Sequence, residues 1–470
     1  MIGRELETKE LRKKFDSDQS EFVAVYGRRR IGKTFLVNEV FHHHFAFHHA
    51  GMENGDRRTQ LASFREAIKR QGLSKCPPLK TWVEAFAVLG DLLDRKQSGK
   101  KVVFLDELPW YDTPKSGFLS AFESFWNGWA SLRNDILLVI CGSSTSWIVN
   151  KVLRNRGGLH NRITKRIPLH PFTLRECEAY AEYKHLGFDR HQLLECYMAF
   201  GGVAYYWSLL EEGKSAAQNL DRLCFAESGE LREEFDSVFQ SLFKTPTRHY
   251  AIINLFGVHK AGLTREEVIK GLGEGSSGEI SDCLDELVEC GFLRRYCLPR
   301  HKKSAVYQLI DNFTLFHFKF LRNRTGNDNH FWSISHNKPG INAWKGLAFE
   351  RICMQHIEQI KRALGISGIL SDVYSWRSPA SGKDEPGAQI DMLIDRDDRI
   401  INLCEIKFSE DEYALDETEE KKLRYRLELF KKTTKTRKGV NVTIITAYGL
   451  KHNKHSCCVQ SEVTLDDLFC

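Results

Sequence analysis

The sequence predicts an α/β protein of several domains, in which a parallel sheet near the N-terminus is followed by helical units and then by a second, mixed α/β unit. Three observations predict this. A glycine-rich loop follows an apolar run at residues 21–26, a second apolar run at 101–107 ends in two carboxylates, and two strand-like segments lie within residues 389–407. At 470 residues the chain is long enough for about two to four domains with substantial cores.

The glycine-rich loop at Gly27–Thr34 reads G-x-x-x-x-G-K-T, and the residues after it, FLVNEVF, are expected to open a helix. This strand–loop–helix order is typical of a P-loop, whose backbone N–H groups and helix N-terminus bind phosphate. We expect Lys33 to reach the β- and γ-phosphates of ATP and the Thr34 hydroxyl to hold Mg²⁺. The expected ATP-binding residues are Gly27, Arg28, Arg29, Arg30, Ile31, Gly32, Lys33, Thr34 and Phe35.

The partner of this loop is the strand predicted at Lys101–Glu107, where Val102–Leu105 are apolar and two carboxylates follow. We expect Asp106 to bind Mg²⁺ and Glu107 to polarise the attacking water, which favours ATP hydrolysis over simple binding. A third strand, Ile136–Cys141, ends in a Gly-Ser-Ser turn. In the additional-strand class of P-loop ATPases a polar residue at this position senses the γ-phosphate. Ser143 or Ser144 would serve, although such a turn is also an ordinary loop.

Composition is consistent with a cytoplasmic protein. Hydrophobic residues make up 42% and charged residues 28% of the chain, and no apolar stretch approaches the roughly 20 residues needed to span a membrane. The N-terminus is charged from Arg4 onward, so no signal peptide is expected. The 13 cysteines include no C-x-x-C pair and are expected to be reduced. A net charge of +6 does not by itself require a nucleic-acid partner.

The pattern along the chain divides it into four expected segments. These are a P-loop ATPase core at 1–170, a helical lid at 171–240, a helical unit at 241–322 and a mixed α/β unit at 335–470. Thr173 and Glu176 are expected to form a capping box at the start of the lid.

The 241–322 unit has the pattern of a winged helix-turn-helix. Helices are predicted at Tyr250–Gly257, from Thr264 and at Glu279–Cys290, and the strands of a wing at 292–310. DNA binding through the third helix would be the usual reading. Its exposed residues are mostly acidic, however, and phosphate repels them, so a structural or regulatory role is favoured.

The C-terminal segment contains a second candidate site. Gln389–Asp395 and Ile400–Lys407 are predicted to pair as a hairpin, which would bring Asp391 and Glu405 to one Mg²⁺. Lys407 would face the same side and act on the attacking water or on the phosphate. Glu350, in a helix predicted at 344–360, would be an additional acidic ligand. This D-x(n)-E-x-K pattern is typical of the restriction-endonuclease-like (PD-(D/E)XK) fold, but it is short, and ordinary exposed carboxylates on a hairpin remain the alternative.

Two further features concern charge and possible metal binding. A helix predicted at 421–438 is rich in lysine and arginine, and either contacts a polyphosphate substrate or is simply a solvated face. The histidines at 42–49 flank Phe41, Phe45 and Phe47 without a consistent strand or helix spacing, and they indicate a strand beside the sheet rather than a metal site.

Nearly the whole chain resembles archaeal-type P-loop ATPases of the AAA+/STAND-like branch that are fused to a winged helix and a C-terminal restriction-endonuclease-like domain of unknown function. The resemblance rests on Ile2–Glu5, the GRRRIGKT loop, FLDELPW at 104–110, the CGSS strand end, Gly201–Val203 and the segments at 387–409 and 465–469. It implies that Ile2–Arg4 lie near the adenine. It also implies that an arginine after the third strand completes the nucleotide site, with Arg154, Arg156 and Arg162 as candidates and Arg162 at the matching position. This arginine would act within the chain or from a neighbouring copy in a homo-oligomer.

Together these features predict an ATP-hydrolysing enzyme that controls a Mg²⁺-dependent nuclease acting on DNA or RNA. The alternative is an ATP-dependent switch whose winged helix and C-terminal domain only bind a protein or nucleic-acid partner. The complete set Asp391, Glu405 and Lys407 favours the nuclease, because a domain used only for binding does not need all three.

Overall fold

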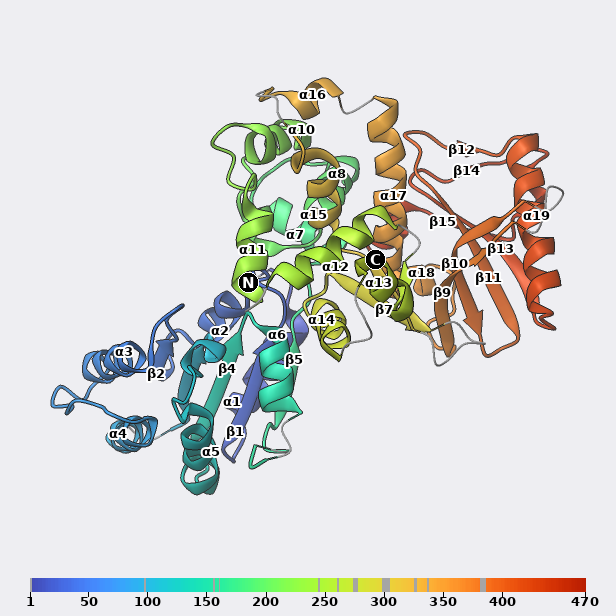
Figure 1. The fold of residues 1–470 in the computed structure, drawn as a ribbon. Helices are drawn as coiled ribbons and strands as arrows, with labels where there is room; N and C mark the ends of the chain where they lie inside the picture. The colour runs from blue at the N-terminus through green and yellow to red at the C-terminus, as the bar shows by residue number, and fades with distance from the viewer. Residues whose placement is uncertain are drawn as a thin grey trace.

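The computed structural model describes residues 2–96, 99–154, 157–159, 161–243, 246–259, 262–273, 278–297, 305–324, 328–335, 338–380 and 386–470. Figure 1 shows an N-terminal α/β unit at one end, a C-terminal α/β unit at the other, and helices between them. No helix among these residues is long and apolar enough to cross a membrane. All thirteen cysteines are free, in agreement with the expected reduced thiols.

The N-terminal unit is built on a five-stranded, fully parallel sheet in the order β2-β3-β4-β1-β5. Its strands are β1 (Glu21–Tyr26), β2 (Phe45–Ala50), β3 (Lys101–Asp106), β4 (Ile136–Gly142) and β5 (Lys165–Pro168). The strands predicted at 21–26, 101–107 and 136–141 are therefore present, and β4 lies between the strand that enters the glycine-rich loop and the strand that ends in Asp106. This is the strand order expected of the additional-strand class.

Helices cover both faces of this sheet because the buried strands are apolar on both sides. Alternate residues of β1, β3 and β4 pack on one face against α1 and α2, and on the other against α3, α4 and α5. The bounds are α1 (Glu5–Phe15), α2 (Lys33–Phe41), α3 (Arg57–Arg70), α4 (Trp82–Asp94), α5 (Phe118–Gly128) and α6 (Thr145–Trp147), with short helical turns at Leu108–Tyr111, Ala130–Leu132 and Ile148–Leu153. Of the histidine cluster, His48 and His49 lie in the edge strand β2, as predicted, whereas His42, His43 and His44 lie in the turn before it.

Next comes a group of short helices, which begins at the predicted capping box of Thr173 and Glu176. Its helices are α7 (Leu174–Tyr183), α8 (Arg190–Phe200), α9 (Ala204–Ser208), α10 (Ala216–Leu220) and α11 (Glu234–Leu242), with a helical turn at Asp221–Phe225. They share one continuous hydrophobic core with the segments that follow, down to one face of the C-terminal sheet.

The predicted helices of the 241–322 unit are present as α12, α13 and α14, beside a three-stranded sheet in the order β6-β8-β7. The bounds are α12 (Pro246–Val258), β6 (Leu263–Thr264), α13 (Arg265–Leu272), α14 (Gly278–Glu289), β7 (Leu293–Cys297) and β8 (Ala305–Leu309). Residues 298–304, which hold most of the predicted basic wing, and 274–277 of the predicted break lie outside the described residues. The classification as a winged helix stays a prediction.

The C-terminal unit is a five-stranded mixed sheet in the order β15-β13-β11-β10-β9, in which β9, β10 and β11 are antiparallel and β13 and β15 run parallel to β11. The strands are β9 (Ser371–Ser378), β10 (Ala388–Arg396), β11 (Ile400–Lys407), β13 (Gly439–Thr446) and β15 (Ser461–Val463), with the separate pair β12 (Tyr413–Ala414) and β14 (Leu450–Lys451). The helices are α15 (Asn312–Phe316), α16 (Phe331–Ser335), α17 (Pro339–Gln355), α18 (Ile357–Ala363), α19 (Glu417–Thr434) and α20 (Leu465–Leu468), with helical turns at His317–Leu321 and Ser456–Cys458.

Two predicted helices have different limits in the structure. The single helix predicted at 344–360 is two helices, α17 and α18, which meet at His356. The basic helix predicted at 421–438 is α19, which starts earlier, at Glu417, and ends at Thr434 because Lys435 adopts a left-handed conformation (φ 50°). Glu417, Glu419 and Glu420 therefore lie in the first turn of α19, where the helix dipole favours negative charge.

Candidate nucleotide and phosphodiester sites

The glycine-rich loop connects β1 to α2 at the carboxyl edge of the sheet, where it takes a tight conformation. Gly27 has φ 145°, and a Cβ there would lie 2.3 Å from the carbonyl oxygen of Leu169. Gly32, with φ 89°, is the N-cap of α2. The loop thus leaves the helix N-terminus open toward a phosphate.

Three polar side chains meet at the loop. The Lys33 ammonium is buried and donates to the carbonyl oxygens of Gly27 and Arg28, at 2.9 and 2.8 Å. Burial lowers the pKa of Lys33. The Thr34 hydroxyl donates to Asp106 across 2.8 Å, which brings together the two predicted Mg²⁺-binding groups. The pairing of a threonine with a carboxylate provides the oxygen donors that Mg²⁺ prefers.

Glu107 follows Asp106 in a left-handed conformation, with φ 45° and ψ 50°. Its carboxylate accepts hydrogen bonds from the backbone N–H and the hydroxyl of Ser143, both at 2.9 Å. Ser143, at the end of β4, therefore contacts the residue predicted to orient the water. Ser144 is instead the N-cap residue of α6 and is only partly buried.

A cavity of about 640 Å³ opens beside the loop, between it and the helices α7 and α9. It includes Ile2 and Arg4, which were expected near the adenine, and Arg29, Gly32, Thr34, Phe35 and Glu107. Phe172, Tyr180, Tyr183 and Tyr205 add aromatic faces that the sequence analysis did not identify. Arg4 stacks 4.6 Å from the ring centre of Phe172 and donates to the His170 carbonyl at 2.7 Å. The Gly201–Trp207 segment, expected to act as a lid, contributes Ala204 and Tyr205 to this cavity.

Two arginines of the loop are held by distant residues. Arg28 forms a buried, two-pronged ion pair with Asp311 and lies over the Phe292 ring. Arg30 pairs with Glu234 of α11 at 3.0 Å and stacks on Tyr205 at 4.1 Å. Their side chains therefore tie the loop to other segments, so any contact of Arg28 with phosphate would come from its backbone.

Two of the three candidate arginines after β4, Arg154 and Arg162, lie outside the lining of the 640 Å³ cavity. Arg162 is exposed and does not line it. Arg154 pairs with Glu289 of α14 at 3.2 Å, and Arg156 lies outside the described residues.

In the C-terminal sheet, Met392 of β10 pairs with Cys404 of β11, so Asp391 and Glu405 take neighbouring positions on one face. Asp391 accepts from the backbone N–H of Ile406 at 3.3 Å. Burial, Glu405 and Glu350 raise the pKa of Asp391 to about 7. Such an excess of carboxylates fits a bound cation.

Glu405 is buried and already has two cationic partners. Lys407 lies 3.0 Å away on the same strand, and Arg426 of α19 forms a second ion pair. Burial would lower the pKa of Lys407, but Glu405 outweighs it and the pKa is raised. Among the described residues no group of three or more His, Cys, Asp and Glu side chains lies close enough to hold a metal ion. The predicted residues are thus close together, and Glu405 is paired with lysine and arginine side chains.

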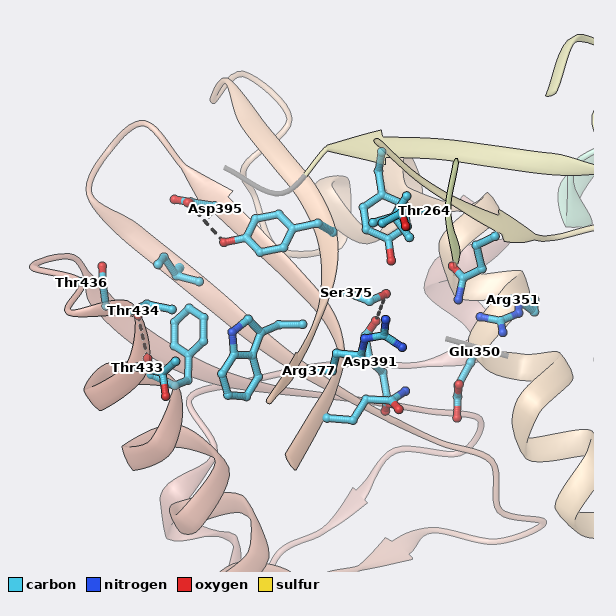
Figure 2. Close-up of a pocket in the computed structure, with 18 of the residues that line it drawn as sticks. Thr264, Glu350, Arg351, Ser375, Arg377, Asp391, Asp395, Thr433, Thr434 and Thr436 are labelled. Carbon is cyan, nitrogen blue, oxygen red and sulfur yellow. Dashed lines mark hydrogen bonds between the residues drawn. The ribbon is translucent and has the colours of Figure 1, made fainter. Parts of the chain in front are cut away.

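Glu350 and Asp391 face a second cavity, of about 600 Å³, in which Glu405 and Lys407 take no part (Figure 2). Sequence reasoning missed Arg426 as a partner of Glu405, although it had identified the basic helix that carries it. No local sequence pattern indicates Asp311, because it is 283 residues away from its partner Arg28.

Comparison with known proteins extends these findings. Residues 1–210 match the model of an ATPase domain found predominantly in Archaea. An uncharacterized protein of Methanocaldococcus jannaschii is 27% identical over 381 residues, which cover 77% of this chain and 78% of that protein. The match extends well beyond the first 210 residues.

Solved structures give more distant matches. A Walker-type ATPase of Pyrococcus abyssi is 13% identical, with a TM-score of 0.49, over 68% of this chain and 96% of its own. The ORC2 protein of Aeropyrum pernix is 13% identical, with a TM-score of 0.44, over 68% of this chain and 93% of its own.

Proposed function

Because residues 1–210 are a P-loop ATPase domain of the archaeal type, we propose that the chain hydrolyses ATP and thereby controls a Mg²⁺-dependent nuclease in its C-terminal unit. The observation that carries the ATPase part is the contact of Thr34 with Asp106 below a loop whose helix N-terminus is open. The observation that carries the nuclease part is the placement of Asp391 and Glu405 on one face of β10 and β11.

In the ATPase, Lys33 exchanges its two loop carbonyls for the β- and γ-phosphates when ATP binds. Thr34 and Asp106 would hold Mg²⁺, which when bound would supply positive charge beside the phosphates. Glu107 orients the attacking water. Ser143, which donates a hydrogen bond to Glu107, senses the γ-phosphate at the end of β4. Arg162 is exposed and outside the cavity, so we propose that it serves the nucleotide of a second copy of the chain.

In the nuclease, Asp391 and Glu405 would hold Mg²⁺, which supplies the charge needed to activate water and to stabilise the leaving oxygen. Glu350 of α17 lies too far from this pair to complete a group of three ligands, but it faces the same cavity as Asp391 and adds negative charge there. Lys407 is fixed beside Glu405 and donates to the water or to a phosphate oxygen.

Control by ATP is supported by contacts between the two sites. Arg28 of the loop binds Asp311, and the next residue, Asn312, accepts from Gln355 at 2.9 Å. Gln355 ends α17, the helix that carries Glu350. A change in the loop conformation on ATP binding could therefore be transmitted to the second site through these few hydrogen-bonded residues.

The winged helix contributes less to nucleic-acid binding in this proposal. Glu289 of α14 pairs with Arg154 of the ATPase core, and Asp285 pairs with Arg295. The acidic side chains of the third helix thus pair with arginines of the same chain, which supports a structural role for this helix.

A second candidate, an ATP-dependent switch that only binds a partner, is favoured by the ion pair between Arg426 and Glu405. In that case Glu405 is structural and no cleavage occurs.

Three variants decide between them. Lys33→Ala is expected to abolish ATP turnover, and Glu405→Gln to abolish Mg²⁺-dependent cleavage while ATP turnover continues. Glu428→Gln, an exposed carboxylate on α19, is the matched control and keeps both activities. Substrates are single- and double-stranded DNA and RNA, with and without ATP. If the wild type cuts none of them, the nuclease is rejected and the switch stands.

A further inference from the structure

The cavity that contains Glu350 and Asp391 is enclosed between two sheets. One wall is the sheet of β7 and β8, with Tyr296 and Gln308, and the other is β9, with Ser375 and Trp376. Figure 2 shows Glu350 and Asp391 toward one end, and Asp395 together with Thr433, Thr434 and Thr436, at and just after the end of α19, toward the other. The cavity is therefore elongated along β9.

Direct bonds hold the two walls together. Arg294 of β7 donates to Ser375 of β9 at 3.2 Å, and Arg377 pairs with Glu267 of α13 at 3.4 Å. The volume of about 600 Å³ is that of a site for one small ligand. A continuous duplex, whose major groove alone is about 12 Å wide, does not fit between walls joined in this way.

The lining offers aromatic faces. Tyr296 and Trp376 are both partly exposed, and Trp376 meets the Phe430 ring edge-on at 5.4 Å. Aromatic side chains bind unpaired bases by stacking, whatever the base. Bases within a duplex are already stacked and cannot use them.

A half-buried arginine, Arg294, lies behind the same wall, and no carboxylate among the described residues pairs with it. The groups that Arg294 contacts are neutral: the Gln308 amide at 2.7 Å, the Met354 sulfur at 3.1 Å, the Ser375 hydroxyl and the Tyr296 ring. Burial lowers the pKa of Arg294 to about 10, and the nearby Arg351 acts in the same direction. A phosphate in the cavity would stabilise both cations.

We propose that this cavity accepts unpaired nucleotides, with bases on Tyr296 and Trp376 and a phosphate near Arg351, so that the C-terminal site takes single strands. The inference builds on the proposed nuclease and specifies its substrate class. The unpaired nucleotides belong either to DNA or to RNA, or are ends splayed from a duplex.

The test is equilibrium binding of fluorescein-labelled oligonucleotides to the full chain, followed by anisotropy. The probes are a twelve-nucleotide oligo-dT, an oligo-U of the same length and a blunt duplex of the same length. Ca²⁺ replaces Mg²⁺ so that binding does not depend on cleavage, and salt is held at a physiological level to limit non-specific attraction. One or both single strands should bind at least about tenfold more tightly than the duplex.

Trp376→Ala should weaken single-strand binding by about tenfold, whereas Trp376→Phe should stay within about threefold of the wild type because it keeps a ring. Tyr448→Ala, in the same unit but outside the cavity, is the matched control. Thermal unfolding checks the fold of each variant, and Tyr296→Leu is the second reporter if Trp376→Ala unfolds.

Two results overturn the inference: equal or tighter binding of the blunt duplex, or single-strand binding that neither aromatic variant weakens. The proposed nuclease fails separately. If single strands bind selectively but are not cleaved in Mg²⁺, the nuclease is rejected and the single-strand site is supported. If a blunt duplex is cleaved, the nuclease is supported and the single-strand site is rejected.

Discussion

Arg28 of the glycine-rich loop and Asp311, just before α15, form an ion pair in which each side chain is only 5% exposed. Asp311 also caps α15 by accepting from the Thr314 backbone and hydroxyl, at 2.9 and 2.6 Å. A single carboxylate thus fixes both the loop and the start of a helix that belongs to the shared core.

Asp311→Asn should destabilise the protein by about 3–5 kcal/mol, because it leaves the Arg28 charge buried without a partner. It should also raise the KM for ATP, since the loop loses its anchor. Urea unfolding and ATPase kinetics measure the two effects. Glu66→Gln, which breaks an exposed ion pair in α3, should leave both near the wild-type values. An unchanged unfolding midpoint for Asp311→Asn would show that the Arg28–Asp311 ion pair does not contribute to stability.

Glu107→Gln should preserve ATP binding and lower ATP turnover by about a hundredfold or more, because the amide cannot accept a proton from the water. Ser143→Ala, which removes one donor to the same carboxylate, should have a smaller effect. Fluorescent-nucleotide binding and phosphate release separate the two steps. If Glu107→Gln weakens ATP binding as much as it lowers ATP turnover, Glu107 contributes to nucleotide binding and not to activation of the water.

Arg426→Gln should lower the melting temperature in EDTA, because only Lys407 then offsets the repulsion between Glu405 and Asp391. Added Mg²⁺ should raise the melting temperature of this variant more than that of the wild type, since a cation takes the vacated position. Arg424→Gln is the matched control, as Arg424 lies on the same helix and pairs with Glu420 instead. If Mg²⁺ stabilises Arg426→Gln no more than the control, the carboxylates do not form a cation site.

Acid should destabilise the protein partly through His356. Burial lowers the pKa of this imidazole to about 4, so the folded state binds the proton less readily than the unfolded state. The stabilisation is complete above about pH 6.5 and is lost as the pH falls toward 4, by about 2 kcal/mol between pH 7.5 and 5. In His356→Gln, the decrease in the free energy of unfolding between pH 7.5 and 5, measured by urea unfolding, should be smaller by that amount. An identical pH dependence in the two proteins would contradict this assignment.

The sequence predicts the elements that local patterns determine. The strands around the glycine-rich loop, the capping boxes at Thr173 and Thr264 and the β10–β11 hairpin are all present, because apolar alternation and capping act within a few residues. The break at His356 was missed, since its cause is distant: the imidazole accepts from the Leu174 backbone, 182 residues away. The partners of Arg28, Arg30 and Glu405 were missed for the same reason.

The hairpin of β10 and β11 has one more consequence, for how the chain tolerates insertions. Asp391 and Glu405 share a face only because the turn between the strands, residues 397–399, has its present length. Side chains alternate along a strand, so one added or lost residue there would point Glu405 to the opposite face. Related chains should therefore vary freely in the identity of these turn residues, and change their number only together with the loss of the paired carboxylates.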